Sequence, residues 1–176
     1  MIAAGVIAAG VIGEEESFEL LGGEIVPRAP EMDKHGYARG VFLRPFVRSL
    51  GDEFLVATEL SLFLFDNTEV KPDLHIFPSA MASDQVRGKD VLLAVEIASS
   101  SHRRDFELKL PLYAEGGVGE LWILDLDAGR AHVYRDPEGR AYRSHSHVGA
   151  DEAISPRAFP HISIKVADLL RKSNAR

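Results

Sequence analysis

The sequence predicts an α/β fold, and three observations support this class. Strand-like apolar runs occupy residues 53–65, 90–101 and 120–126. A segment whose apolar residues follow helical spacing, 102–115, separates the last two runs. The composition of the 176 residues, 45% apolar, 27% charged and 8% aromatic, suits a globular domain with a hydrophobic core. It excludes a disordered chain, a collagen-like repeat and a coiled coil.

The first part of the chain predicts a β-hairpin followed by a helix. Gly22-Gly23 separates two short strand-like segments within residues 18–27, and glycine readily adopts the positive φ of a tight turn. We expect a helix from Asp33 to Leu50, because its apolar residues recur three to five positions apart and Asp33 suits the N-cap. Pro45 should bend or shorten this helix.

The strands that follow are predicted from their apolar patterns. Residues 53–65 should form one strand, and residues 70–77 another that contains Asp73. Residues 90–101 begin as a strand covered on both faces. The helix over 102–115 and the strand over 120–126 come next.

The end of the chain predicts a hairpin and a short helix. The hairpin falls within residues 131–144, and the helix covers 166–172. We find no domain boundary between residues 17 and 176, and we therefore expect one domain preceded by an N-terminal arm over residues 1–16.

The charge distribution limits how nucleic acid could be bound. The formal net charge is −7, and residues 1–100 carry eight basic and sixteen acidic residues, against twelve and eleven in residues 101–176. Bulk electrostatic attraction to phosphates needs an excess of lysine and arginine. Nucleic-acid binding by this chain must therefore be local, assisted by a metal ion or made by a dimer.

Cysteine is absent, which excludes disulfides, thiolate zinc sites and cysteine nucleophiles and fits a reducing cytoplasm. The apolar stretch over residues 1–13 is shorter than the roughly 20 residues that span a bilayer, and it lacks the basic start of a signal peptide. We expect a cytoplasmic protein that does not insert into a membrane.

Two charged residues stand where the pattern demands apolar ones. Glu96 interrupts an apolar strand, and an ionised carboxylate there is costly unless a cation or donors meet it. Lys109 lies within the apolar stripe of the next helix, thirteen residues later. A short strand-to-helix connection packs the helix back onto its own sheet, so the two groups could share one pocket. The alternatives are an exposed glutamate and a lysine that reaches out to solvent.

Asp73 is the third candidate. It follows Pro72, which favours the start or edge of a strand, although Pro-Asp is also a common turn. Two carboxylates beside a lysine are what a Mg²⁺ or Mn²⁺ site for phosphodiester hydrolysis requires. The carboxylates hold a hard cation, and the lysine orients or activates the attacking water.

The chain resembles the Uma-type family of restriction-endonuclease-like proteins, within the PD-(D/E)XK nuclease superfamily. The resemblance covers about residues 17–136 and rests on the following motifs, taken as a set: Phe18-Glu19-Leu20-Leu21-Gly22-Gly23-Glu24, His35, Pro72-Asp73, Val95-Glu96-Ile97, Asp105 with Lys109, Tyr113, Gly117-Val118 and Glu120-Leu121-Trp122-Ile123. It implies a mixed central sheet flanked by helices, with additional N-terminal and C-terminal hairpins. It further implies a divalent-metal site and nuclease-like chemistry.

The resemblance also implies roles for individual residues. Asp73 and Glu96 match the metal carboxylates, and Lys109 matches the catalytic lysine. The superfamily pattern places that lysine two residues after the glutamate, where this chain has Ala98, whereas the Uma-type pattern moves it to the following helix. Glu24 is similar to an early acidic residue of the family, either a further metal or water ligand or an exposed hairpin residue.

Four basic residues are candidates for contact with nucleic acid. His35 matches a recurrent family histidine, which could assist metal binding, contact phosphate or serve the fold alone. His102, Arg103 and Arg104 stand at the start of the Lys109 helix, where backbone N–H groups and basic side chains favour a phosphate. A solvated first turn explains these three residues nearly as well.

The sequence therefore predicts a Mg²⁺- or Mn²⁺-dependent endonuclease that acts on nucleic acid, DNA in the first instance, as a homodimer. No phosphate-binding loop of the GxxxxGK[ST] or GxGxxG type occurs, so we expect no nucleotide cofactor. The alternative is an inactive scaffold or partner-binding protein with the same fold. In that protein Lys109 and Glu96 would simply neutralise each other.

Overall fold

A computed structural model describes residues 17–28, 33–99 and 104–171 of the chain. The expected N-terminal arm, 1–16, lies outside these residues. The central feature of the fold is a six-stranded sheet, in which the strands lie in the order β10-β9-β8-β7-β6-β3. The six strands are β3 (Phe54–Ala57), β6 (Leu74–Pro78), β7 (Leu93–Ala98), β8 (Glu120–Asp125), β9 (Arg130–Glu138) and β10 (Ala141–Gly149).

The sheet is mixed. Strands β7 and β8 run parallel, while the other neighbouring pairs run antiparallel. A parallel pair needs a long crossover connection, and here the chain between β7 and β8 contains two helical segments. These segments are the π-helix η3 (Arg104–Lys109) and the α-helix α3 (Leu110–Glu115). The expected mixed sheet flanked by helices is confirmed.

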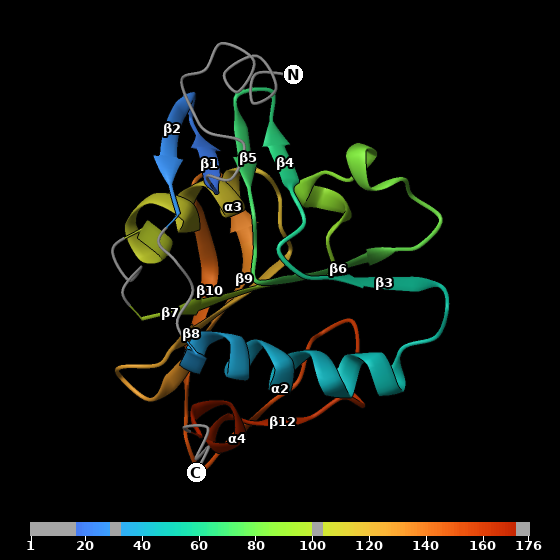
Figure 1. The fold of residues 1–176 in the computed structure, drawn as a ribbon, viewed down its shortest axis with the longest axis vertical. Helices are drawn as coiled ribbons and strands as arrows, with labels where there is room; N and C mark the ends of the chain where they lie inside the picture. Colours follow the sequence, from blue (N-terminus) through green and yellow to red (C-terminus); the bar gives the residue numbers. More distant parts are fainter. Residues whose placement is uncertain (1–16, 29–32, 100–103, 172–176) are drawn as a thin grey trace.

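A second sheet of four strands, in the order β2-β1-β5-β4, lies on the side of the central sheet where α3 packs (Figure 1). Its strands are β1 (Phe18–Leu21), β2 (Glu24–Pro27), β4 (Leu62–Phe65) and β5 (Thr68–Val70). Strands β1 and β2 form the predicted hairpin, in which Gly22 and Gly23 have φ values of 62° and 91°. This positive φ is why a glycine pair occupies the turn.

The opposite side of the central sheet is covered by helix α2 (Asp33–Ser49) and helix α4 (Val166–Leu170), as Figure 1 shows. Near them lies a small sheet of β11 (Ala153–Ile154) and β12 (Ile164–Lys165). Two short 3-10 helices, η1 (Ser83–Gln85) and η2 (Gly88–Asp90), connect β6 to β7. No helix within the described residues is long and apolar enough to cross a membrane.

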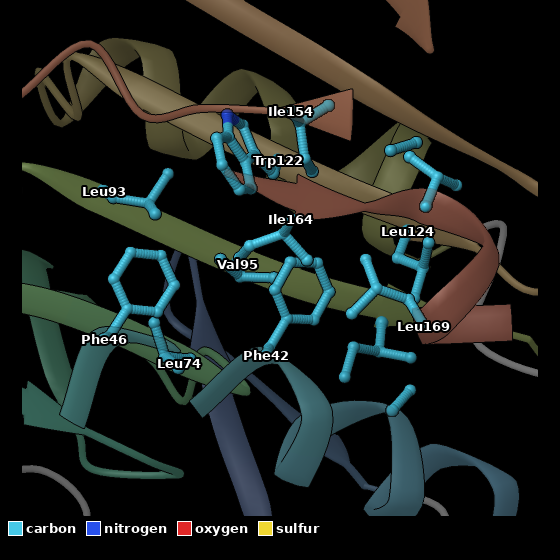
Figure 2. Packing of buried hydrophobic residues seen from close by; sticks show 14 of the residues in the cluster. Phe42, Phe46, Leu74, Leu93, Val95, Trp122, Leu124, Ile154, Ile164 and Leu169 are labelled. Atoms are coloured by element: carbon cyan, nitrogen blue, oxygen red, sulfur yellow. The ribbon is translucent and has the colours of Figure 1, made fainter. Parts of the chain in front are cut away.

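The central sheet separates two hydrophobic clusters because successive side chains of a strand point to opposite faces. Leu93, Val95 and Ile97 of β7 pack on the side of α2, and Ala94 and Ala98 pack on the side of α3. The cluster on the α2 side also contains buried residues of α2 and Trp122 of β8 (Figure 2).

Helix α2 forms over the expected range, but Pro45 neither ends nor shortens it. Phe42 and Phe46 are fully buried, and the Phe42 ring lies 6.2 Å from the Trp122 ring, centroid to centroid. Each such buried phenylalanine stabilises the fold by about 1.5–3 kcal/mol. We attribute the tolerance of Pro45 to this packing, because a proline inside an isolated helix is destabilising by about 3 kcal/mol.

Two strand predictions are wrong. Residues 53–65 form two strands, β3 and β4, which belong to different sheets. The chain turns between them at Glu59, whose φ is 51°. Residues 70–77 are likewise divided between β5 and β6, so Asp73 lies between two strands and not inside one. Pro72 has no N–H to donate to a ladder, which fits this break.

Candidate functional site

The candidate site is centred on Glu96, which lies on the face of β7 that packs toward α3. Its side chain is only 4% exposed. The Lys109 ammonium lies 2.6 Å from its Oε1 atom and donates a hydrogen bond to it. The hydroxyl of Tyr113 donates a second, at 2.5 Å, to the same oxygen. The strand and the helical segment that follows it therefore meet at one carboxylate.

The backbone around Lys109 explains how the lysine points inward. Residues 104–109 form a π-helix, and the regular helix α3 starts at Leu110, with Pro111 in its first turn. Proline lacks an N–H and is tolerated at the start of a helix but not within one, so Pro111 favours a new helical start here. π-Helical turns are frequent at functional sites. The Lys109 ammonium also lies 3.8 Å from Asp105, one turn earlier.

Glu19 is a further buried acid beside Lys109, and the sequence did not predict it as a metal ligand. It lies on β1 and is fully buried, and its Oε1 atom is 2.9 Å from the Lys109 ammonium. The backbone N–H of Lys71 donates to the same oxygen at 2.7 Å. A sequence signal existed, because Glu19 interrupts an apolar strand just as Glu96 does. Glu24, the acid chosen in this hairpin, is exposed on β2 opposite Leu21.

Asp73 approaches the site from the start of β6. It is buried, and its Oδ2 atom accepts a 2.6 Å hydrogen bond from the backbone N–H of Ile97. Ile97 directly follows Glu96, which puts the two carboxylates on neighbouring parts of the sheet. Their charges interact, because Asp73 contributes to raising the pKa of Glu96 and Lys109 acts to lower that of Asp73. The structure thus brings the three predicted residues together.

Among the described residues of the site, buried acids outnumber buried cations. Glu19, Glu96 and Asp105 lie 2.6–3.8 Å from the Lys109 ammonium, and Asp73 interacts with it electrostatically. Burial raises the pKa of Glu96 to about 8 against the partial compensation of Lys109, and burial also raises the pKa of Asp73. Burial lowers the pKa of Lys109. The surrounding acids, of which Glu96 has the largest effect, raise it by more, so that it lies above the ordinary value.

The donor atoms present fit a hard divalent cation. The Oε2 atom of Glu19 and the Oδ1 atom of Asp73 are buried, and neither has a hydrogen-bond partner among the described residues. Buried polar atoms are normally hydrogen-bonded, so an atom without a partner points to a missing ligand. Carboxylate oxygens are the ligands that Mg²⁺ and Mn²⁺ prefer.

The candidates for nucleic-acid contact are placed differently. His35, in the first turn of α2, donates from Nε2 to the carbonyl oxygen of Ile97 at 2.7 Å and lies 3.4 Å from Asp73. Its side chain is 16% exposed, so it borders the acidic cluster. His102 and Arg103 lie outside the described residues, as does the side chain of Arg104.

Comparison with solved structures supports the fold. The chain is similar to a crystal structure described as "a putative nuclease belonging to DUF820" from Anabaena variabilis. The TM-score is 0.70 and the identity 15%, over 93% of this chain and 94% of that chain. At this identity the likeness shows a shared fold. No curated protein matches the chain.

A family model also matches the chain. The model of the Uma2 family, described as "Putative restriction endonuclease", matches residues 8–167. This range includes β1, β7 and the helical segment with Lys109, and so every acid of the buried cluster. Because this match spans most of the chain, the chain belongs to the Uma2 family.

Proposed function

We propose that this protein is a metal-dependent nuclease that hydrolyses phosphodiester bonds of nucleic acid. The observation that carries the proposal is the excess of buried acids at Lys109, together with the two buried carboxylate oxygens, on Glu19 and Asp73, that have no hydrogen-bond partner among the described residues. A family of restriction-endonuclease-like proteins and a nuclease-like fold agree with this activity.

Asp73 and Glu96 are the proposed ligands of Mg²⁺ or Mn²⁺, and Glu19 is a third in place of Glu24. When bound, the ion polarises a phosphoryl oxygen and favours ionisation of water. Lys109 adds a fixed positive charge, which stabilises the negative charge that develops on the phosphoryl group. Tyr113 and Lys109 both donate to Glu96 and hold its carboxylate in one orientation. His35 positions Asp73 from the side of α2.

Calorimetric titration with Mn²⁺ tests the metal site. Asn in place of Asp73 keeps an oxygen that can accept from the Ile97 N–H, so the Asp73→Asn variant should fold while losing the charge of one ligand. We expect the parent to bind Mn²⁺ and Asp73→Asn to bind at least about tenfold more weakly, since ligand charge sets affinity in such sites. Asp84→Asn, at an exposed acid, should bind as the parent does.

Nicking of supercoiled plasmid DNA tests the catalytic role. Lys109→Met should abolish Mn²⁺-dependent nicking, while Lys34→Met, which changes a lysine paired with Asp127 at the surface, should retain it. Circular dichroism at pH 6 would verify that both variants are folded. Full nicking by Lys109→Met, with an active parent, would show that the lysine has no catalytic role.

The second candidate is an inactive scaffold or partner-binding protein with the same fold. The observation that favours it is that Lys109 pairs directly with Glu96 and Glu19 in the interior, where the three side chains are 0–4% exposed. In such a protein the network only neutralises buried charge. A flat Mn²⁺ titration of the parent would favour the scaffold over the enzyme.

DNA is the proposed substrate, and a homodimer is the proposed active form. A chain of net charge −7 offers few phosphate contacts by itself, and two copies present a larger surface. The apolar stretch over residues 1–13 is the proposed dimer contact. Light scattering should give twice the mass of one chain, and a monomeric mass would remove the dimer. Nicking assays on duplex DNA and single-stranded RNA would separate the substrates.

A further inference from the structure

Three histidines gather at the edge of the central sheet, on the face that also carries Glu96, with His132 two strands away from Glu96 in the same cross-strand row. His132 lies on β9, and His145 and His147 lie on the edge strand β10. In the antiparallel register His147 is directly opposite His132, and His145 is opposite Tyr134. Opposite residues of paired strands share a face, as do residues two apart on a strand. The hairpin therefore presents all three rings on the same side.

The ring nitrogens are close enough to share an ion. One nitrogen from each histidine lies within 4.8 Å of the other two, and Nδ1 of His132 is 3.2 Å from Nε2 of His145. Zinc–nitrogen bonds of about 2.0–2.1 Å in a tetrahedron place ligand nitrogens about 3.4 Å apart. Small side-chain rotations would close the remaining difference, and His145 and His147 are exposed at the surface.

A further observation points to a ligand. The Nε2 atom of His132 is buried and has no hydrogen-bond partner within the part of the chain that the structure describes. Buried polar atoms are normally hydrogen-bonded, and imidazole nitrogen is a common metal ligand.

We propose that His132, His145 and His147 form a site for a divalent transition metal of the zinc class. Imidazole nitrogen suits Zn²⁺ and its neighbours in the series, whereas the carboxylate oxygens at Lys109 suit Mg²⁺ and Mn²⁺. Three protein ligands leave one position for water or another group. The ion would join β9 to β10 at the sheet edge. The proposal does not depend on nuclease activity.

The surroundings hold the rings in place. Tyr134 stacks on His145 with ring centroids 4.2 Å apart, and Phe106 of η3 packs edge-on against His132 at 4.8 Å. These contacts orient the ligands as a supporting shell does in other metal sites. Phe106 directly follows Asp105, so the histidine site and the acidic cluster both contact the short helical segment η3.

Zinc competition with a chromogenic chelator tests the site on full-length protein without a histidine tag. Loss of a supporting residue alone lowers metal affinity by about 10–100-fold, so removal of two ligands in His145→Gln/His147→Gln should weaken Zn²⁺ binding at least tenfold. His161→Gln, at an exposed histidine elsewhere, should bind as the parent does. Parent protein loaded with Co²⁺ should show visible absorption bands that the double variant lacks.

Asp73→Asn separates this site from the acidic one and should leave zinc affinity unchanged, also with excess Mg²⁺. Equal zinc binding by the parent and the double histidine variant would overturn the proposal and leave the histidines as an aromatic stack only. Loss of zinc binding in Asp73→Asn alone would also overturn it, because the ion would then sit among the carboxylates.

Discussion

The Lys109 ammonium lies 2.6 Å from Glu96 in the interior of the protein, where both side chains are less than 5% exposed. The same ammonium lies 2.9 Å from Glu19 on the other sheet. One lysine therefore joins the two sheets through two carboxylates. A buried pair of this kind is strongly destabilised when one partner is removed, because the other charge is left uncompensated.

Lys109→Met should lower the free energy of unfolding, and more at high pH than at low pH. At pH 9 the parent holds an ionised Glu96 paired with Lys109, whereas in the variant this carboxyl must either keep its proton or lie charged without a partner, and we expect a loss of about 3–5 kcal/mol. At pH 6 Glu96 holds its proton, because burial raises its pKa to about 8, and the loss should be smaller. Urea unfolding at the two pH values measures both.

Lys34→Met is the matched control for this comparison. Lys34 pairs with Asp127 at 3.3 Å on the surface, where such pairs contribute less than about 1 kcal/mol. Its effect should be small at both pH values. An equal loss for Lys109→Met at pH 6 and pH 9 would contradict a raised pKa of Glu96.

The parent, without metal, should become less stable relative to Glu96→Gln as pH rises from about 4.5 to about 8. Over this range the unfolded chain has released the Glu96 proton while the folded chain retains it. The folded state then binds more protons, so its stability falls with pH, with a slope on the order of 1 kcal/mol per pH unit. Urea unfolding of both proteins across this range measures the difference.

The comparison with Glu96→Gln is needed because other groups titrate in the same range. Burial lowers the pKa of His75 to about 4, and that of His132 is lowered similarly. Each of these histidines lowers the free energy of unfolding as pH falls from 6.5 to 4. This change with pH is opposite in sense to that caused by Glu96. Both contributions are common to the two proteins and cancel in the difference. A difference that does not vary with pH would show that Glu96 is already ionised in the folded protein.

The sequence predicted the centre of the site because charged residues stand out within apolar patterns. Glu96 and Lys109 interrupt apolar patterns on adjacent elements, and local periodicity suffices to detect that. Glu19 interrupts a strand of only four residues, and in this hairpin the family pattern favoured Glu24, the first residue of the next strand. Which of two acids in a short hairpin is buried depends on the packing of β1 against β5, and that contact joins residues far apart in the sequence.

The fold was predictable in class and less so in its connections. The apolar pattern over residues 53–65 predicts one strand, yet β3 and β4 belong to different sheets. The turn depends on Glu59, which lies 2.8 Å from Arg39 of α2 and whose N–H donates to the carbonyl of Pro72 at 3.1 Å. These partners are contributed by distant segments, and no local pattern reveals them. The π-helix before α3 escaped prediction for the same reason.

Glu19→Gln and Glu24→Gln should differ in their effect on Mn²⁺ binding. Glu19 is buried and carries an Oε2 atom without a hydrogen-bond partner among the described residues, so its loss should weaken binding by about tenfold or more. Glu24 is exposed on β2, and Glu24→Gln should bind as the parent does. Calorimetric titration measures both affinities. Weaker binding by Glu24→Gln alone would restore Glu24 as the ligand.

Tyr113→Phe should destabilise the protein more than Tyr142→Phe does. The Tyr113 hydroxyl donates to the Glu96 carboxylate, whereas the Tyr142 hydroxyl donates to the neutral carbonyl of Val118 at 2.8 Å. Hydrogen bonds to charged groups contribute about 1.5–3 kcal/mol and neutral ones about 0.5–1.5. Urea unfolding at pH 9, where Glu96 is ionised, should show the larger loss for Tyr113→Phe. Equal losses would mean that the Glu96 carboxylate carries no charge at that pH.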